Sequence, residues 1–358
     1  MMRASWKAAC IAALMSGLVL ASSGLAAENK LPKRLTMASL AIGTSNNAMA
    51  NALAKVATEY SGMLVVTRPA SSASFWIKTT NDKGSPEIGF AHVLDVWWAF
   101  SGKLAPYPIP DSPYGEVPFY DESRNLRLLV AGPRMWVGVL APKDKPWKSL
   151  TDAKGARLAG GFTAHPGGYA GLVGALALEN LSETKDFTMV PVPTANAGTT
   201  AMSEGRVELA MQTVGNALVS EVNSRTPVHF LDVPHDEASL NRLHRVFPGS
   251  EVKLYTGRAP GVEKDTWLIS YPMAVTASTH MSDDVAYALV KSWWEHYEDT
   301  WNIHVSCKGW GKDQFVLPNT TIPYHPGAIR FFKEKGVWTD EMSAYQEELL
   351  EGKYPFLK

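Results

Sequence analysis

Short runs of β-branched and apolar residues alternate along this chain with longer stretches of helical periodicity. The run at 34–42 is followed by a helical pattern over 48–60, in which Ala52, Val56 and Tyr60 recur on one face. The same order returns several times, and such alternation is typical of parallel βαβ units. The sequence therefore predicts an α/β fold whose strand-to-helix loops gather at the carboxyl ends of the strands.

These strand–helix units fall into two clusters, separated by extended apolar segments near 126–141 and 266–277. The chain of 358 residues exceeds the size at which a single hydrophobic core stops growing. The chain therefore passes between the two clusters twice, once out and once back. This predicts a second lobe inserted into the first, with lobe I at 28–134 and 268–358 and lobe II at 135–267. We expect two paired open sheets with a ligand cleft between them and a hinge at the crossing strands.

The amino-terminal segment has the three-part pattern of a secretory signal peptide. Arg3 and Lys7 precede a mostly apolar stretch over 8–27 that ends in small residues. We expect cleavage of residues 1–27 and a periplasmic mature protein, with a membrane anchor as the alternative. Cleavage leaves Cys307 alone, so we expect no intramolecular disulfide and a fold that depends on its core.

Charge and short motifs narrow the function. The net charge is −1 and no run of Lys and Arg occurs, so binding to nucleic acid or to an anionic membrane is not predicted. His92 and Asp95 lie three residues apart without a third metal ligand nearby, and H-E-x-x-H, C-x-x-C and G-x-S-x-G are all missing from the sequence. We expect no metal, no cofactor and no catalytic residues. A secreted hydrolase on a two-lobe fold is the less favoured alternative.

Three loops that precede predicted helices carry small polar residues, and each is a candidate carboxylate site. Free backbone N–H groups and the positive end of the helix dipole favour an anion there, although plain helix capping explains any one loop. Each dipole contributes only about 0.3–1 kcal/mol, so a tight site needs several to converge. The candidates are Thr44, Ser45, Asn46, Ser71, Ser72, Ser74, Thr163, His165 and Gly167.

Arg134 is the sharpest single candidate, because a guanidinium can meet a carboxylate with two parallel hydrogen bonds. It lies at the predicted hinge, and a structural ion pair is the alternative. Trp76 and Trp136 follow predicted cleft loops and are expected to wall the pocket, with lobe core as the alternative. For Trp97 and Trp98 we favour the core, because adjacent helical positions cannot both face one site.

Six segments in order carry a resemblance to a known family. They are Ala41-Ile-Gly-Thr44, Pro69–Ser74, Glu87–Asp95, Ser149–Gly155, Ala201–Ala210 and, most specific, Ile322-Pro-Tyr-His-Pro-Gly-Ala-Ile-Arg-Phe-Phe-Lys-Glu-Lys-Gly336. Over nearly the whole mature chain, the sequence resembles the TAXI-type solute receptors of TRAP transporters, a branch of the type II periplasmic binding protein fold.

The resemblance implies a receptor that takes a small organic, carboxylate-bearing solute to the membrane subunits of a TRAP-type secondary permease. A receptor of an ABC importer is the alternative. The family's cleft closes from the position of Thr213 and Asn216, which join His92 as ligand-binding candidates. The loops that line the cleft in that family differ here, at 45–49, 71–76 and 132–136, so the resemblance does not carry the solute's identity.

Overall fold

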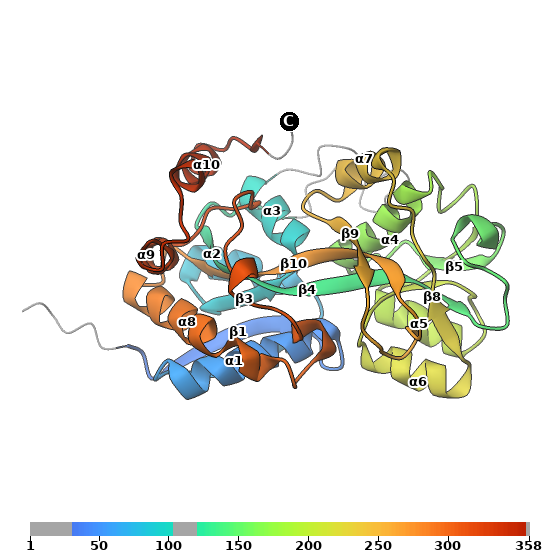
Figure 1. Ribbon diagram of the computed structural model, residues 1–358, viewed down its shortest axis with the longest axis horizontal. Helices are drawn as coiled ribbons and strands as arrows, with labels where there is room; N and C mark the ends of the chain where they lie inside the picture. Colours follow the sequence, from blue (N-terminus) through green and yellow to red (C-terminus); the bar gives the residue numbers. More distant parts are fainter. Residues whose placement is uncertain (1–30, 103–119, 356–358) are drawn as a thin grey trace, which may run out of the picture. The chain divides into compact units, whose positions relative to one another are not determined.

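A computed structural model describes residues 31–102 and 120–355 of the chain (Figure 1). The predicted signal peptide at 1–27 and the proline-rich stretch over 106–118 lie outside the described residues. Within those residues, none of the helices combines the length and the apolar character that a bilayer crossing requires.

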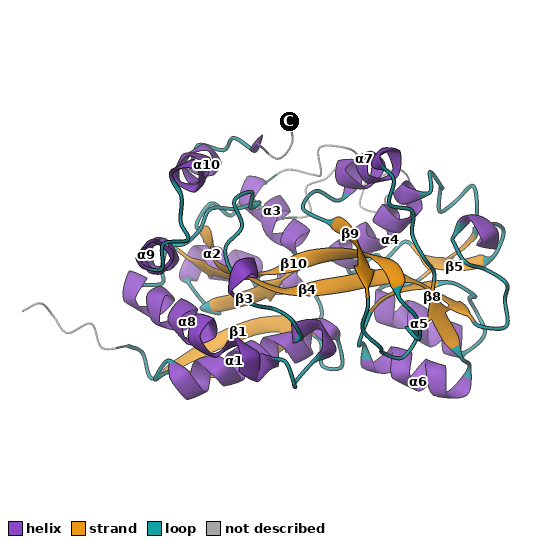
Figure 2. Cartoon of the chain, in the orientation of Figure 1, coloured by secondary structure: helices purple, strands orange, loops and turns teal. Residues whose placement is uncertain are grey.

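In the described part of the chain, one mixed sheet of eight strands runs through the protein (Figure 2). Its order is β2-β1-β3-β10-β4-β7, with β8 paired to β4 and β9 paired to β10. The pairs β1–β2 and β1–β3 are parallel, whereas β10 runs antiparallel to β3, β4 and β9. The strands are β1 (Arg34–Leu40), β2 (Leu64–Ala70), β3 (Ile88–Ala91), β4 (Leu126–Pro142), β7 (Ala210–Thr213), β8 (Val228–Phe230), β9 (Glu251–Tyr255) and β10 (Thr266–Ser278).

A second, two-stranded parallel sheet is formed by β5 (Arg157–Gly160) and β6 (Thr188–Pro191). The expectation of two separate open sheets is therefore corrected. The two long strands β4 and β10 pair along most of their lengths, β10 carries β3 near its end, and β4 carries β7 and β8 beyond position 136. One ladder thus joins the strands of both predicted lobes, and these two strands are the crossing segments that the sequence indicated.

The pairing of β4 with β10 is irregular at two places, between Pro272 and Ala274 and between Val275 and Thr276. Arg134 pairs with Pro272 and Ala131 pairs with Ala274, so the register shifts between these pairs. Pro133 lies within the shift, where its missing N–H costs no regular ladder bond. This bulge lets β4 run unbroken through Gly132 and Pro133.

Helices cover the sheets and begin with side-chain caps that the sequence supplies, such as Thr44, whose Oγ1 accepts from the N–H of Asn47. The α-helices are α1 (Ser45–Tyr60), α2 (Ile77–Lys83), α3 (Val93–Ser101), α4 (Pro166–Leu178), α5 (Ala195–Ser203), α6 (Ala217–Arg225), α7 (Glu237–Val246), α8 (Asp283–His296), α9 (Pro326–Glu334) and α10 (Asp340–Leu350). Short 3₁₀ turns occupy Ala73–Phe75, Thr151–Ala153, Tyr297–Thr300, Val305–Cys307 and Lys312–Gln314.

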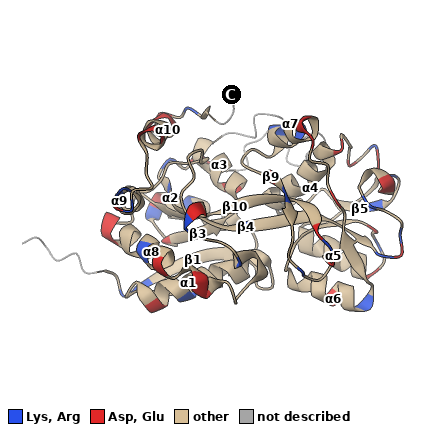
Figure 3. Cartoon of the chain, in the orientation of Figure 1, with Lys and Arg blue, Asp and Glu red and all other residues tan. Residues whose placement is uncertain are grey.

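Large aromatic side chains fill the core. Trp97 and Trp98 are both buried, as the sequence indicated. Trp293 of α8 is fully buried, and its indole N–H donates to the carbonyl of Leu53 in α1 at 2.9 Å. Helix α8 thereby holds α1, whose first residues reach the site described next. Charged side chains of both signs are scattered among the surface elements (Figure 3).

Candidate functional site

A cavity of about 280 Å³ lies where strand ends and helix starts from both predicted lobes meet. Strands β4 and β10 supply Met135, Val137, Tyr271 and Met273, so the hinge ladder forms one wall. The remaining lining comes from the ends of other strands, the loops that follow strands and the first turns of helices, in agreement with the expected geometry of open α/β sheets. These residues are Leu40, Ala41, Thr44, Ser45, Asn46, Ser71, His92, His165, Gly168, Thr194, Ala195, Asn196, Met211, Gln212, Thr213 and Asn216.

The N-cap residues of five helices line this cavity. They are Thr44 of α1, His92 of α3, His165 of α4, Thr194 of α5 and Asn216 of α6. Each helix start has free N–H groups and the positive end of a dipole, and their convergence adds contributions that are small one at a time. Among the described residues that line the cavity, none is Lys, Arg, Asp or Glu. The cavity therefore favours an anionic or strongly dipolar group without a cationic side chain.

His92 is the most informative residue of the lining. Its Nδ1 accepts from the N–H of Leu94 at 3.1 Å, which places the proton of the neutral ring on Nε2. Its side chain is buried, at 6% exposure, and Nε2 has no hydrogen-bond partner in the described part of the chain. Burial, with a smaller contribution from His165, lowers the pKa of His92 to about 3, so the ring is neutral near pH 7.

Two other histidines show what is unusual about His92. His304 and His325 also stand at helix starts, and each Nδ1 accepts from the N–H two residues ahead at 3.1 Å. In both, Nε2 has a carbonyl partner, which is Gly215 at 3.3 Å for His304 and Met281 at 3.0 Å for His325. Only at His92, of these three, does a buried N–H remain unpaired, and a buried donor without a partner costs about 1–3 kcal/mol.

The two sides of the cavity touch. The hydroxyl of Ser45, at the start of α1, lies 2.9 Å from the hydroxyl of Thr213 at the end of β7. It also lies 3.2 Å from the carbonyl oxygen of Val214. The side chain of the next residue, Asn46, accepts from the N–H of Leu40 and donates to the carbonyl of Phe90. These two bonds connect α1 to the ends of β1 and β3. The contacts of Ser45 therefore join the start of α1 to the end of β7 across the cavity.

A network of amide side chains forms the wall on the side of β7. The amide nitrogen of Gln212 donates to Asn196 at 3.1 Å and to Thr199 at 2.9 Å. Asn216 donates to Asn196 and to Gln212, at 3.1 and 3.2 Å. Because these amides hold one another, their orientations are fixed before any ligand enters, which lowers the entropic cost of binding.

Comparison with known proteins places this architecture in a family. A model of the NMT1-like family matches residues 111–336, which is more than half of the sequence. The chain belongs to the NMT1-like family. No curated protein matches it.

Solved structures similar to this NMT1-like protein show its fold. The periplasmic binding protein BugD is 16% identical, with 90% of this chain and 98% of that chain covered and a TM-score of 0.51. A periplasmic transporter is 12% identical, with 91% and 100% covered and a TM-score of 0.50. The fold of this chain is the two-lobe α/β fold of periplasmic binding proteins.

The structure of this NMT1-like protein brings eight of the predicted site residues into the cavity and leaves seven outside it. Trp76 is buried against Gly89, Trp136 packs edge-on against Tyr255 at 5.1 Å, and Thr163 is exposed. Inside are Thr44, Ser45, Asn46, Ser71, His92, His165, Thr213 and Asn216. Outside are Ser72, Ser74, Trp76, Arg134, Trp136, Thr163 and Gly167. The two serines among these bond to each other, since the Oγ of Ser74 donates to that of Ser72.

Arg134, which was predicted to clamp a carboxylate in the cleft, does not line the cavity around His92. Its Nη2 lies 2.6 Å from the carboxylate of Glu251, and its Nε donates to the hydroxyl of Ser270 at 2.9 Å. The side chain lines a different cavity, which borders the loop before β9. The guanidinium therefore connects β4 to β9 and β10. This is the structural ion pair that was the alternative prediction for Arg134.

We expect Arg134→Ala to leave solute affinity within about threefold and to lower the free energy of unfolding by about 1–2 kcal/mol, because a partly buried charged hydrogen bond is lost. Urea unfolding and isothermal titration with a captured solute check the two halves. Glu251→Gln is the matched control and should show the same pattern. A loss of binding with unchanged stability would instead support the predicted role of Arg134 as a carboxylate clamp.

Sequence reasoning missed Thr194, Asn196, Gln212 and Tyr271 of the lining. The signal for the first two was present, since Thr194 caps a helix directly after β6, the same pattern that singled out residues 44–46. Gln212 directly precedes the predicted Thr213 at the end of its strand. Tyr271 lies inside a long strand, and nothing local distinguishes it from the core.

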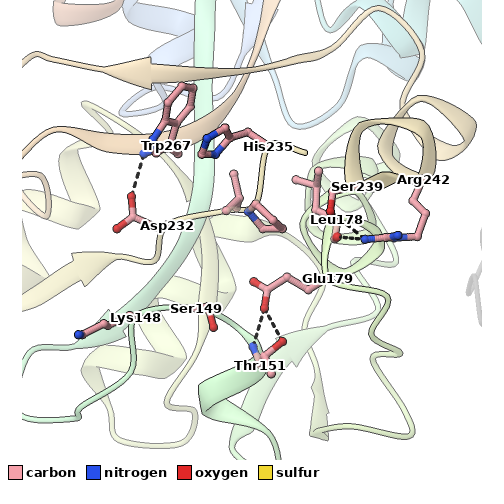
Figure 4. Close-up of a pocket in the computed structure, with 12 residues that line it drawn as sticks. Lys148, Ser149, Thr151, Leu178, Glu179, Asp232, His235, Ser239, Arg242 and Trp267 are labelled. Atoms are coloured by element: carbon pink, nitrogen blue, oxygen red, sulfur yellow. Dashed lines mark hydrogen bonds between the residues drawn. The ribbon is translucent and has the colours of Figure 1, made fainter. Parts of the chain in front are cut away.

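A second cavity, of about 510 Å³, is shown in Figure 4. Its polar groups already serve the fold. Glu179 accepts from the N–H and hydroxyl of Thr151, and Arg242 donates to the carbonyl of Leu178 and the hydroxyl of Ser239. Among residues 31–102 and 120–355, no group of three His, Cys, Asp or Glu is placed to hold a metal ion. The cavity around His92 is therefore the candidate site.

Proposed function

We propose that this NMT1-like protein is a solute-binding receptor that captures a small organic, carboxylate-bearing molecule in the cavity around His92 and delivers it to a membrane permease. The observation that carries the proposal is the buried Nε2–H of His92, unpaired in a cavity lined by five helix starts. A carboxylate oxygen at this position would satisfy the donor and face the positive ends of the dipoles.

The rest of the lining supports a compact solute with an apolar part. Met135, Met211 and Met273 present flexible side chains that adapt to irregular shapes, and Val137 and Leu40 add aliphatic surface. Amide and hydroxyl groups around Gln212 and Thr213 suit further polar substituents. At about 280 Å³ the closed cavity excludes a peptide or an oligosaccharide, so release requires the cleft to open.

A thermal-shift screen of the purified protein tests the proposal. The probes are mono- and dicarboxylates, amino acids and aromatic acids. A solute that binds only the folded state adds about 2.7 kcal/mol of stability at a hundredfold excess over its Kd, which gives a clear rise in Tm. The absence of any shift across the carboxylates would contradict the proposed solute class. Conversion of a probe into product in these mixtures would favour the hydrolase alternative.

For the partner we propose the membrane subunits of a TRAP-type secondary permease, in line with the resemblance of the segments 41–44 and 322–336 to TAXI receptors. Export by the predicted signal peptide would place the receptor in the periplasm. Uptake of the captured solute by cells decides between the partners. An ionophore that dissipates the ion gradient should stop uptake by a TRAP-type system, whereas dependence on ATP alone would indicate an ABC importer.

A further inference from the structure

A buried carboxylate bridges two helices that belong to different predicted lobes. Asp95 lies in the first turn of α3 in lobe I and is only 4% exposed. Its carboxylate accepts from the backbone N–H of Gly167, in the first turn of α4 in lobe II. The hydroxyl of Tyr120 donates to its Oδ1 at 2.9 Å. The contact between Asp95 and Gly167 therefore joins the two predicted lobes.

The fit at this contact leaves no room for a side chain. A Cβ added to Gly167 would lie 2.6 Å from Oδ2 of Asp95, closer than real Cβ atoms approach a neighbour, and 3.1 Å from its Cγ. The start of α4 thus rests directly on the carboxylate. Opening the cleft would separate the two and expose the carboxylate to water.

Within the described part of the chain, no cationic side chain is a partner of this carboxylate. The described groups that face it are the hydroxyls of Tyr120 and Tyr271 and the N–H of Gly167, with His92 and His165 at the starts of the two helices. Burial lowers the pKa of His165 to about 4 and that of His92 to about 3, so both rings are neutral. For Asp95, burial outweighs its two hydrogen bonds and raises the pKa to about 7 in the closed cleft.

We propose that Asp95 is a proton-dependent latch across the cleft, so that closure of the two lobes takes up a proton and rising pH favours the open state. The latch rests on the proposed function in one respect, which is that the cleft opens and closes. In the open state the carboxylate meets water and ionises in its ordinary range. A group that binds its proton more tightly in the closed state stabilises that state at low pH, and this stabilisation is lost as the pH rises through the closed-state pKa.

A protonated Asp95 keeps its partners. One oxygen still accepts from Gly167, and the acid O–H donates to the hydroxyl oxygen of Tyr120, which can act as either donor or acceptor. With a closed-state pKa of about 7 and an ordinary open-state value, the ratio of closed to open molecules falls about tenfold from pH 6 to pH 8.

Small-angle X-ray scattering on the full chain without added solute tests the latch, because closure lowers the radius of gyration. The probe is the proton alone, so a failed solute screen leaves this result unaffected. We expect a smaller radius at pH 6 than at pH 8. Asp95→Asn, which is neutral and keeps both hydrogen bonds, should stay compact at both pH values. Gly167→Ala, whose methyl group meets the carboxylate, should stay extended at both.

Glu183→Gln is the matched control. Glu183 is equally buried, at 4% exposure, but it accepts from Gly161 and Tyr169, which both lie in lobe II. This variant should keep the pH response of the unaltered protein. An equal radius at pH 6 and pH 8 in the unaltered protein would overturn the latch, and so would a full pH response that persists in Asp95→Asn.

Discussion

Asparagine in place of His92 should lower solute affinity about 10- to 100-fold while leaving Tm of the solute-free protein nearly unchanged. Asparagine is a preferred N-cap residue, and its side-chain oxygen can accept from the N–H of Leu94 as Nδ1 of His92 does. It does not reach the place of the Nε2–H. A hydrogen bond to a charged group contributes about 1.5–3 kcal/mol, which corresponds to this loss of affinity.

The matched control for this substitution is His325→Asn. His325 caps α9 with the same geometry, but its Nε2 is already bonded to the carbonyl of Met281. The control should lose stability and keep affinity, the reverse of His92→Asn. Isothermal titration and thermal unfolding of both variants measure the two quantities. Unchanged affinity in His92→Asn would show that this residue does not contact the solute. The proposed function would then lose the observation that carries it.

Truncation of Trp293 to alanine should produce the largest loss of stability, about 3–5 kcal/mol. The indole is fully buried between α8 and α1, so its removal leaves a cavity as well as lost apolar contact. It also leaves the carbonyl of Leu53 without its donor. Urea unfolding measures the loss in the free energy of unfolding, provided that the m-value is the same for both proteins. The loss is a large part of the 5–15 kcal/mol that stabilises an ordinary domain.

Trp293→Phe separates packing from hydrogen bonding. Phenylalanine fills most of the site but cannot donate to Leu53, so we expect a smaller loss, of about 1–2 kcal/mol. If the alanine variant lost no more stability than the phenylalanine variant, α8 would not be packed on α1 as described. Because α1 starts with Ser45 and Asn46 of the site, the alanine variant should also bind solute more weakly at temperatures close to its Tm.

The fold was predictable from the sequence because its signals are local. Alternating strand and helix patterns predicted the order of the elements, and β1 lies within the run at 34–42. The extended segments expected near 126–141 and 266–277 are β4 and β10. Strand β9 was missed because Glu251 and Lys253 give it the polar character of an edge strand.

The site was predictable only in part. Loops between a strand and a helix carry a local signal, and this signal led to Thr44, Ser45 and Asn46, whereas Asn216 came from the family resemblance. The roles of Arg134 and Trp76 depend on distant partners. Glu251, which binds Arg134, is 117 residues away along the chain, and nothing near position 134 indicates it. The same holds for the unpaired Nε2–H of His92, which is visible only once every neighbour has a position.

The continuous ladder of β4 and β10 determines how such a cleft can move. Flexible linkers would let two halves swing in many directions, but a pair of hydrogen-bonded strands twists about one axis and resists the others. Regular pairing is interrupted at 131–134 opposite 272–274 and again at 128–130 opposite 275–276, and deformation is easiest at such irregularities. Motion concentrated at these irregularities would return the loops at the two edges of the cleft to the same positions each time the cleft opens and closes. The backbone geometry of β4 and β10 would then determine how reproducibly the loops meet.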